Sequence, residues 1–252
     1  MKSATMVDGD TAVVVVGNLE YEGGYTDFVA VKLDASDGTE IWRYEDTTNS
    51  SRYLNGVVEA DGGSVVLAGS MEGTDGTRSE DGTDYADFAA IKLDADGLEL
   101  WTFKDGTLYA DWFGAVEVQQ DGSLLFVGAT NGSWSGVNSE GSSGLTTDVV
   151  VMSLSTDGEE LWRWQAGSGD EDSFTTIAVG ADGRVLVAGC TAGSWGQPNS
   201  GDEDFIALLL DTGFAPTPAP STTAPTTPPS KAPTPPVPSP VPPSASPAGP
   251  TA

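Results

Sequence analysis

The chain of 252 residues contains no histidine and a single cysteine, Cys190. Without histidine, a serine or cysteine nucleophile has no imidazole base, and zinc sites built on histidine or on paired cysteines are excluded. One cysteine also excludes an intrachain disulfide. We interpret Cys190, which follows Gly189 in an apolar run, as a small buried side chain rather than a reactive thiol. The enzyme classes that remain are mainly those that depend on carboxylates.

Basic residues are scarce: the chain has ten Lys and Arg against 38 Asp and Glu, and its net charge is −28. Such a chain has no basic patch that could displace counterions from phosphates, so we do not expect nucleic acid as a partner. Long apolar runs are missing as well. None approaches the ~20 residues of a membrane-spanning helix, and we therefore expect no membrane insertion.

Proline is almost absent from residues 1–213, where only Pro198 occurs, and the other prolines begin at Pro216. This shift predicts a β-repeat region over 1–213 and a disordered Pro/Ser/Thr/Ala-rich tail or stalk over 214–252. The S-P, T-P and A-P dipeptides of the tail resemble the glycosylated stalks of plant and algal wall proteins. A ligand for SH3-type domains is the alternative.

The first residues, MKSATMVDGD, lack the apolar core of a signal peptide. Met1 nevertheless falls almost directly on a strand of the repeat described below. We interpret this position as a sign that a beginning is missing, so the lack of a signal peptide does not argue against secretion.

What the sequence does contain is a repeat that begins at Asp27, Asp87, Asp148 and Asp204. Three copies read DFVAVKLDASDGTEIWRY, DFAAIKLDADGLELWTF and DVVVMSLSTDGEELWRW, and an incomplete last copy reads DFIALLLD. Each full copy turns at Asp-Gly, which is a hairpin signal because glycine accepts the positive φ of a tight turn. A second hairpin precedes each copy, as in GAVEVQQDGSLLFVGAT.

The two hairpins together predict an all-β fold, a β-propeller-type array of four four-stranded blades. The predicted blades cover about 3–46, 53–104, 113–165 and 174–211. We expect the last blade to lack its outer strand, because the chain runs into proline after Asp211. The array is either a small closed ring that is capped by other means or part of a longer propeller.

Three tryptophans, Trp42, Trp101 and Trp162, recur five residues after the aspartate of each turn. Recurrence at the structural period favours a packing role over ligand binding. We therefore interpret them as structural staples, each wedged against a neighbouring blade.

The combined pattern of D-[FV]-x-[AV]-x-K-L-D, a D-G turn, E-x-W and a closing D-G-x-[VL]-x-V-x-G resembles the SBBP-type β-propeller repeat. The L-D-x-x-[DT]-G-x-x-x-W portion also resembles, more distantly, quinoprotein-type propeller repeats. The SBBP resemblance implies a propeller fold and a secreted or surface-attached protein, and it implies no catalytic residue. The third copy departs from the pattern, because Ser153 and Ser155 replace the Lys and Asp of K-L-D.

The loops between the second and third strands of the blades are longer than hairpins need, and binding residues often lie on such loops. Two of them share a pattern, GSWSGVNS and GSWGQPNS, which places Trp134 with Asn138 and Trp195 with Asn199. An aromatic ring beside amide side chains suits the apolar face and the hydroxyls of a sugar. The alternative is that each tryptophan anchors its own loop.

Carboxylates gather on the same predicted face, and Asp81, Asp84, Asp170 and Asp172 are its candidate calcium ligands, because hard cations need several oxygens. No segment matches a complete calcium-binding loop, and the Asp-Gly turns are explained by hairpins without metal. We expect no cofactor, with calcium as the alternative.

Asp111 and Asp172 occupy equivalent places, each ten residues after a repeated tryptophan. One interpretation is a polar residue that caps the crossing between blades; the others are ligand contact or acid–base chemistry on a glycoside. Our leading hypothesis is a non-catalytic secreted or cell-surface binding or adhesion scaffold that presents an acidic, tryptophan-bearing loop face to a protein or carbohydrate. The alternatives are a carboxylate-dependent glycosidase or lyase and a purely structural repeat spacer.

Overall fold

The computed structural model describes residues 1–20, 26–45, 52–72, 85–134, 146–180, 184–195 and 198–210. In this part of the chain the regular structure is β-strand, with one short 3-10 helix. No helix in these ranges is long and apolar enough to cross a membrane. Asn138, Asp81, Asp84 and the predicted tail lie outside the described residues.

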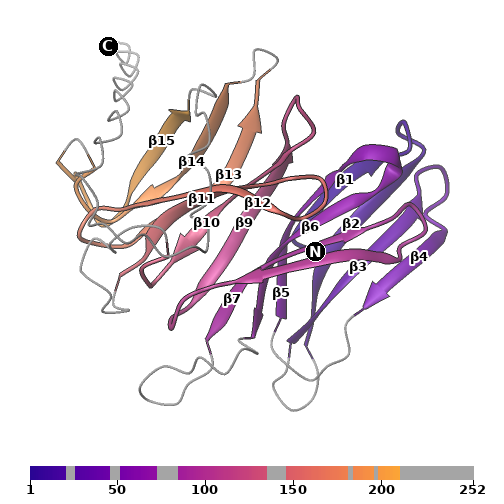
Figure 1. The fold of residues 1–252 in the computed structure, drawn as a ribbon, viewed down its shortest axis with the longest axis horizontal. Helices are drawn as coiled ribbons and strands as arrows, with labels where there is room; N and C mark the ends of the chain where they lie inside the picture. Colours follow the sequence, from indigo (N-terminus) through magenta and orange to yellow (C-terminus); the bar gives the residue numbers. More distant parts are fainter. Residues whose placement is uncertain are drawn as a thin grey trace, which may run out of the picture.

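The strands form four antiparallel sheets that follow one another along the chain (Figure 1). Sheet 1 contains β1 (Ser3–Val7), β2 (Ala12–Glu20), β3 (Thr26–Asp34) and β4 (Glu40–Glu45). Sheet 2 contains β5 (Arg52–Glu59), β6 (Val65–Glu72), β7 (Ala86–Leu93) and β8 (Glu99–Asp105), and the 3-10 helix η1 (Asp61–Gly63) lies in the turn between β5 and β6. Sheet 3 contains β9 (Asp111–Val118), β10 (Leu124–Thr130), β11 (Asp148–Leu154) and β12 (Glu160–Ala166). Sheet 4 contains β13 (Asp172–Val179), β14 (Val185–Thr191) and β15 (Asp204–Leu210).

Within each sheet, strands that are neighbours in the chain are neighbours in space, which is the meander topology of a propeller blade. The predicted all-β fold of four blade-like sheets is confirmed. Among the described residues the last sheet has three strands. The expectation that it lacks an outer strand concerns residues after 210, which lie outside the described residues.

The Asp-Gly turns have the backbone conformation that their sequence predicts. Gly97 and Gly158 have φ values of 83° and 84°, in the left-handed region that glycine enters without a steric cost. In the first of these turns, Asp94 Oδ1 accepts hydrogen bonds from the backbone N–H of Asp96 at 2.9 Å and of Leu98 at 2.8 Å. The turn at 182–183 lies outside the described residues.

Three clusters of buried apolar side chains hold the array together, and each joins two consecutive sheets. Sheets 2 and 3 lie between two others, so the whole of β6 except its last residue, and all of β10, are buried on both faces. In the described residues no cluster joins sheet 4 to sheet 1. In Figure 1 these two sheets stand at opposite sides of the molecule, and the array is open.

The repeated tryptophans lie at the junctions between sheets. Trp101 Nε1 donates to the backbone oxygen of Thr156 in the next sheet at 3.0 Å, and its ring lies so close to Gly158 that a Cβ there would be 2.9 Å from it. Trp42 makes the equivalent contacts in the preceding junction. Trp162 is partly buried and packs on the cluster between sheets 3 and 4.

A buried lysine accompanies each of the first two tryptophans. Lys92, 5 % exposed, donates to Asp61 Oδ1 at 2.7 Å and to the backbone oxygen of Thr156 at 3.1 Å. Lys32 makes the same two kinds of bond in the first junction. The K-L-D lysine of the repeat is thus a cross-sheet contact.

The third sheet has Ser153 in place of this lysine, and a glutamine side chain supplies a hydrogen bond in place of the ion pair. Gln119 stands in the turn where sheets 1 and 2 have the aspartate, and its Nε2 donates to Ser153 Oγ at 3.4 Å and to Ser123 Oγ at 2.8 Å. A neutral polar pair therefore replaces an ion pair at the same repeat position.

Candidate functional site

The end of the sheets that carries the crossings between sheets and the loops between second and third strands is here called the loop end; the opposite end, with the Asp-Gly turns, is the turn end. At the loop end the terminal residues of adjacent strands form rows across each sheet. In sheet 3, Thr130 pairs with Asp111 on one side and Asp148 on the other. In sheet 4, Thr191 pairs with Asp172 and Asp204 in the same way.

Asp111 is fully buried and closes the crossing that leads into β9. Its Oδ2 accepts a hydrogen bond from the backbone N–H of Thr107 at 2.5 Å and one from the Thr107 hydroxyl at 3.0 Å. The Thr130 hydroxyl donates to Oδ1. The side chain thus satisfies the backbone of the crossing that precedes it.

Asp172 repeats this arrangement one sheet further along, with an exposed fraction of 1 %. Its Oδ2 accepts from the backbone N–H of Ser168 at 2.5 Å and from the Ser168 hydroxyl at 2.9 Å, and Thr191 supplies a further side-chain bond. Neither Asp111 nor Asp172 lies on a surface that a ligand reaches.

Each of these aspartates faces a carboxyl of the preceding sheet. Asp87 Oδ1 and Asp111 Oδ2 both lie within 2.9 Å of the point where a side chain on Gly106 would begin. Asp87 is 5 % exposed and forms an ion pair with Lys104, whose Nζ is 3.3 Å from Asp87 Oδ2. Glycine is required at 106 because a Cβ would collide with both carboxyls.

The next junction has an equivalent pair, with Gln165 at the repeat position of Lys104. Asp148 and Asp172 face each other across Gly167, and Gln165 Nε2 donates to Asp148 Oδ2 at 2.9 Å. In the first junction the residue at the Asp111 position is Arg52, at the start of β5. The three junctions therefore differ in charge although they share one backbone arrangement.

Burial raises the pKa of Asp111 and of Asp172. Desolvation raises the pKa of Asp111 to about 7, while the hydrogen bonds from Thr130 and Thr107 act in the opposite direction and the charge of Asp87 adds to the rise. The pKa of Asp172 is also raised, mainly by burial. A raised pKa is a common feature of catalytic acids, but here the carboxyls are enclosed by the crossings that they hold.

The Trp134 side chain is engaged within the protein. Its ring centroid lies 4.3 Å from that of Phe88, and the Arg163 guanidinium carbon lies 4.2 Å from the ring. Its Nε1 donates to Asp105 Oδ2 at 3.0 Å, and its backbone N–H donates to Gln165 Oε1 at 2.7 Å. These contacts anchor the loop at the junction of sheets 2 and 3.

Trp195 and Asn199 lie in the equivalent loop of sheet 4. Trp195 is partly buried against the cluster between sheets 3 and 4. Asn199 donates to the backbone oxygen of Ala192, and its Oδ1 accepts from the backbone N–H of Gly201 at 2.7 Å. The side chains of this pattern thus hold their own loop.

Exposed carboxylates gather beside this loop. Asp170 and Glu171 precede the first strand of sheet 4, Asp202 and Glu203 precede its third strand, and all four are exposed. The two pairs are neighbours because β13 and β15 flank the same strand, β14, so the strand starts are separated by roughly 10 Å. Within the described ranges, no group of three or more Asp, Glu, Cys or His side chains is arranged to hold a metal ion.

The residues that hold these aspartates are not among the candidates that the sequence pattern indicated. Thr107, Ser168 and Ser200 each lie four residues before an aspartate that accepts their backbone N–H. This [ST]-x-x-x-D spacing recurs at the repeat period for Thr107 with Asp111 and for Ser168 with Asp172, and it is the signal that could have identified them. Arg163 and Gln165 carry no such signal.

The chain matches no protein-family model, and its similarity to SBBP-type repeats stays a resemblance. A curated protein that is similar is the regulatory protein FlaEY of Caulobacter vibrioides, which is 30 % identical over 209 residues, 75 % of this chain and 21 % of FlaEY. The chain therefore spans about a fifth of the length of that relative.

Similar solved structures include the periplasmic gluconolactonase PpgL of Pseudomonas aeruginosa, at 11 % identity over 84 % of this chain and 68 % of that one, with a TM-score of 0.41. A variant of the Synechocystis apocarotenoid oxygenase is 12 % identical over 83 % of this chain and 46 % of its own, with a TM-score of 0.40. Sqt1 of Chaetomium thermophilum is 13 % identical over 84 % and 69 %, at 0.31. The fold assignment rests on the four antiparallel sheets of the chain itself.

Proposed function

We propose that the chain is a non-catalytic binding scaffold whose acidic loop end receives a basic surface of a protein partner. The observation that carries this proposal is the exposure of Asp170, Glu171, Asp202 and Glu203 beside one another at the loop end of sheet 4. Complementary charge steers association and sets specificity, and the net charge of −28 makes a cationic surface the natural complement.

The burial of the loop-end aspartates supports a non-catalytic role. A general acid must come within hydrogen-bond reach of the group that it protonates. Asp111 and Asp172, whose pKa values are raised, are 0 % and 1 % exposed and are held by threonine and serine. A substrate would have to displace the crossings to reach them.

The engagement of Trp134 supports a protein partner over a carbohydrate. A stacking platform for a sugar needs an open aromatic face, whereas the Trp134 ring contacts Phe88 and Arg163. A glycan array probed with the intact chain tests the carbohydrate alternative directly, and saturable binding to a defined glycan would favour that alternative.

A secreted or cell-surface location remains part of the proposal, with the proline-rich tail as an extended spacer. FlaEY is named a regulatory protein. A regulatory role exerted through binding would suit a scaffold without a catalytic set, and for this chain it is a proposal only.

The test uses a lysine-rich peptide as a probe for the partner's basic surface. In the loop-end variant, Asp170, Glu171, Asp202 and Glu203 are changed to their amides. In the control variant, the exposed turn-end residues Asp10, Asp96, Asp157 and Glu159 are changed to theirs. We expect the loop-end variant to lose about tenfold in affinity by calorimetry and the control variant much less.

Both variants change the charge by the same amount, so an equal loss in the two would show that bulk charge alone attracts the peptide and would contradict the proposal. The rival enzyme hypothesis is tested by a turnover screen on polysaccharides. Hydrolysis or elimination that a single Asp→Asn change abolishes would overturn the non-catalytic assignment.

A further inference from the structure

The last sheet has an apolar face that is left open. Leu186, Phe205 and Leu209 are 46 %, 79 % and 43 % exposed. They share one face, because Leu186 pairs with Leu209, and Cys190, four residues further along β14, pairs with Phe205. We call this surface, formed by Leu186, Cys190, Phe205 and Leu209, the sheet 4 outer face.

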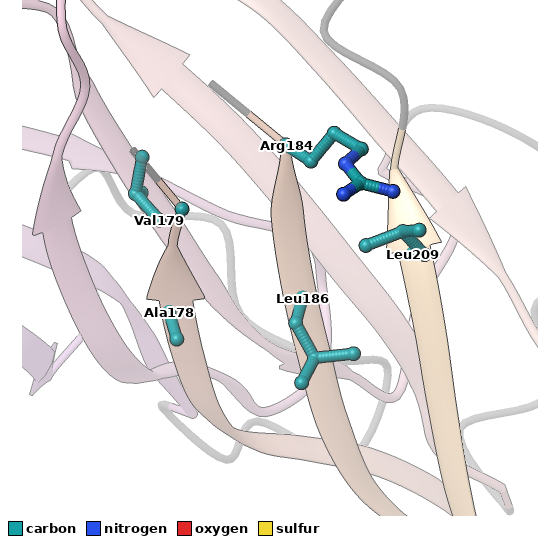
Figure 2. Close-up of a pocket in the computed structure, with 6 residues that line it drawn as sticks. Ala178, Val179, Arg184, Leu186 and Leu209 are labelled. Carbon is teal, nitrogen blue, oxygen red and sulfur yellow. The ribbon is translucent and has the colours of Figure 1, made fainter. Parts of the chain in front are cut away.

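A hollow of about 300 Å³ lies at one end of this face (Figure 2). Leu186 and Leu209 stand beside each other there on adjacent strands, with Ala178 and Val179 on the third strand and Arg184 above them. The hollow is shallow and mainly aliphatic, so it suits an apolar side chain of another protein surface better than a polar small molecule.

The equivalent positions in the preceding sheets are buried. In sheet 3, Leu125 and Val149 stand where Leu186 and Phe205 stand in sheet 4, and they are 1 % and 0 % exposed. Sheet 4 itself covers them, with Val187 in the shared cluster. The sheet 4 outer face therefore has the composition of a junction surface, and no further sheet of the described chain covers it.

The first sheet presents the opposite kind of junction surface. Val15 pairs with Val31 on the face of sheet 1 that points away from sheet 2, and Met6, 43 % exposed, belongs to the next row on that face. We call this surface, formed by Met6, Val13, Val15, Val29, Val31 and Leu33, the sheet 1 outer face. Apart from Met6 its members are partly exposed.

Sheet 2 shows what covers such a surface. Leu67 and Ile91 stand where Val15 and Val31 stand in sheet 1, and they are 0 % and 1 % exposed. They belong to the cluster with Val14 and Phe28 of sheet 1. Phe28 occupies the repeat position of Phe205 in sheet 4. Each internal junction is thus a face of the sheet 4 type laid on a face of the sheet 1 type.

We propose that the sheet 4 outer face of one copy of this chain docks on the sheet 1 outer face of a second copy. Repeat arrays that end in water carry polar outer faces on their terminal repeats. The sheet 4 outer face and the sheet 1 outer face both keep the apolar residues of the internal junctions, and the three internal junctions show that the two kinds of face are complementary. A second copy supplies the missing complement to each.

The new junction has no lysine bond of the kind seen in the first two, because Leu209 stands where Lys32 and Lys92 stand. It rests on apolar burial, as does most of the junction between sheets 3 and 4. Since the two faces differ, the contact is heterologous, and repeated head-to-tail docking closes into a ring or continues as a chain of copies.

The first experiment is the mass of the full 252-residue chain in solution, by sedimentation equilibrium over a concentration series. We expect a mass that is a multiple of the 25.9 kDa of one copy. A single-copy mass at every concentration overturns the proposal.

The second experiment identifies the two faces by mixing. Phe205→Asp spoils the sheet 4 outer face, and Val31→Asp spoils the sheet 1 outer face; Met6→Asp is the milder second variant, because Met6 is already 43 % exposed. Each variant alone is expected to be a single copy. A mixture of Phe205→Asp with Val31→Asp or Met6→Asp retains one intact junction and is expected to form a complex of two copies.

Leu98→Asp is the matched control, since Leu98 is 66 % exposed in the Asp-Gly turn of sheet 2 and lies on neither outer face. It is expected to assemble like the unaltered chain. Circular dichroism serves as the check that all variants are folded. Loss of assembly in Leu98→Asp, or a mixture that stays as single copies, contradicts head-to-tail docking.

Discussion

At the scale of single residues, aspartates that accept the same hydrogen bonds have opposite pKa shifts in different surroundings. Asp111, Asp172 and Asp204 each accept the backbone N–H of a threonine or serine four residues earlier. Burial raises the pKa of Asp111 and of Asp172, whereas the hydrogen bonds from Ser200 lower the pKa of the partly exposed Asp204. At Asp111 and Asp172, desolvation outweighs the hydrogen bonds that favour the carboxylate.

The first prediction concerns the pH dependence of stability. The pKa of Asp111 rises from its ordinary 3.8 to about 7 on folding, so the folded chain holds this proton more tightly than the unfolded chain. The contribution of this carboxyl to stability is therefore complete below about pH 4 and is lost as the pH rises through about 7. Asp111→Asn, which never ionises, should remove a dependence on the order of 2–4 kcal/mol over this window.

The measurement is urea unfolding of Asp111→Asn and the unaltered chain at a series of pH values. Asp61 and Asp204, whose pKa values are lowered, act in the opposite direction and are common to both proteins, so only the difference between the two curves is interpreted. Asp96→Asn, an exposed change, serves as the control. A difference that does not vary with pH would contradict the assignment.

The second prediction concerns Gly106. A methyl group at this position would lie 2.5 Å from Asp87 Oδ1 and 2.9 Å from Asp111 Oδ2, closer than real contacts allow. Gly106→Ala should therefore lower the free energy of unfolding by about 1–3 kcal/mol. Gly201→Ala, where nothing lies within 4 Å, should change it by less than about 0.5 kcal/mol. Equal losses of stability for the two variants in chemical denaturation would show that the backbone preference of alanine, not a collision with the carboxyls, determines the effect of a side chain at residue 106.

At the scale of elements, each junction is a strand of one sheet held to a turn of the next. Trp101 and Lys92 both donate to the backbone oxygen of Thr156 in the Asp-Gly turn of sheet 3. Gly158 in the same turn leaves space for the tryptophan ring. The turn residues that shape the hairpin thus also shape the surface on which the preceding sheet packs.

The third prediction follows from the unequal burial of the ion pair in this junction. The Lys92 side chain is 6 % exposed and that of Asp61 is 71 % exposed. Asp61→Asn leaves a buried ammonium without its carboxylate, whereas Lys92→Met leaves a carboxylate that water still solvates. Asp61→Asn should destabilise the chain more, by about 2–3 kcal/mol against about 1 kcal/mol for Lys92→Met.

Thermal and urea unfolding of the two variants, with Asp96→Asn as the exposed control, measures this difference. The reverse order of stability, with Lys92→Met the less stable variant, would show that the lysine acts through its methylene packing more than through its charge.

At the scale of the whole molecule, a large negative charge is spread over an array that is held together by apolar junctions. The net charge is −28, and the three core clusters contain no acidic residue. Salt screens the repulsion between the exposed carboxylates, while the junctions depend on apolar burial.

The fourth prediction is that salt stabilises the folded chain. Raising sodium chloride from ~20 mM to ~300 mM shortens the Debye length from roughly 20 Å to below 8 Å and should raise Tm by several degrees. The variant with amides at Asp170, Glu171, Asp202 and Glu203 should respond less. Calcium compared with magnesium at equal ionic strength separates specific binding from screening, and a fall in Tm with added salt would contradict the prediction.

Much of this architecture follows from the sequence alone. The Asp-Gly turns, the alternating apolar runs and the repeat period predicted the hairpins, their order and the four sheets, because these features depend on residues that are near one another in the chain. The absence of histidine and of paired cysteine excluded whole classes of site, because a residue type that is missing from the sequence cannot contribute to a site in any fold.

Only the tertiary structure decided what the singled-out side chains do. Trp134 and Trp195 share one sequence context, yet the Trp134 ring is covered by Phe88 and Arg163, which come from other strands. The facing carboxyls of Asp87 and Asp111, and the open outer faces of sheets 1 and 4, likewise arise where separate repeats meet or fail to meet. Such contacts join residues far apart in the chain, and it is the packing of sheet on sheet, not the local pattern, that sets their burial and charge.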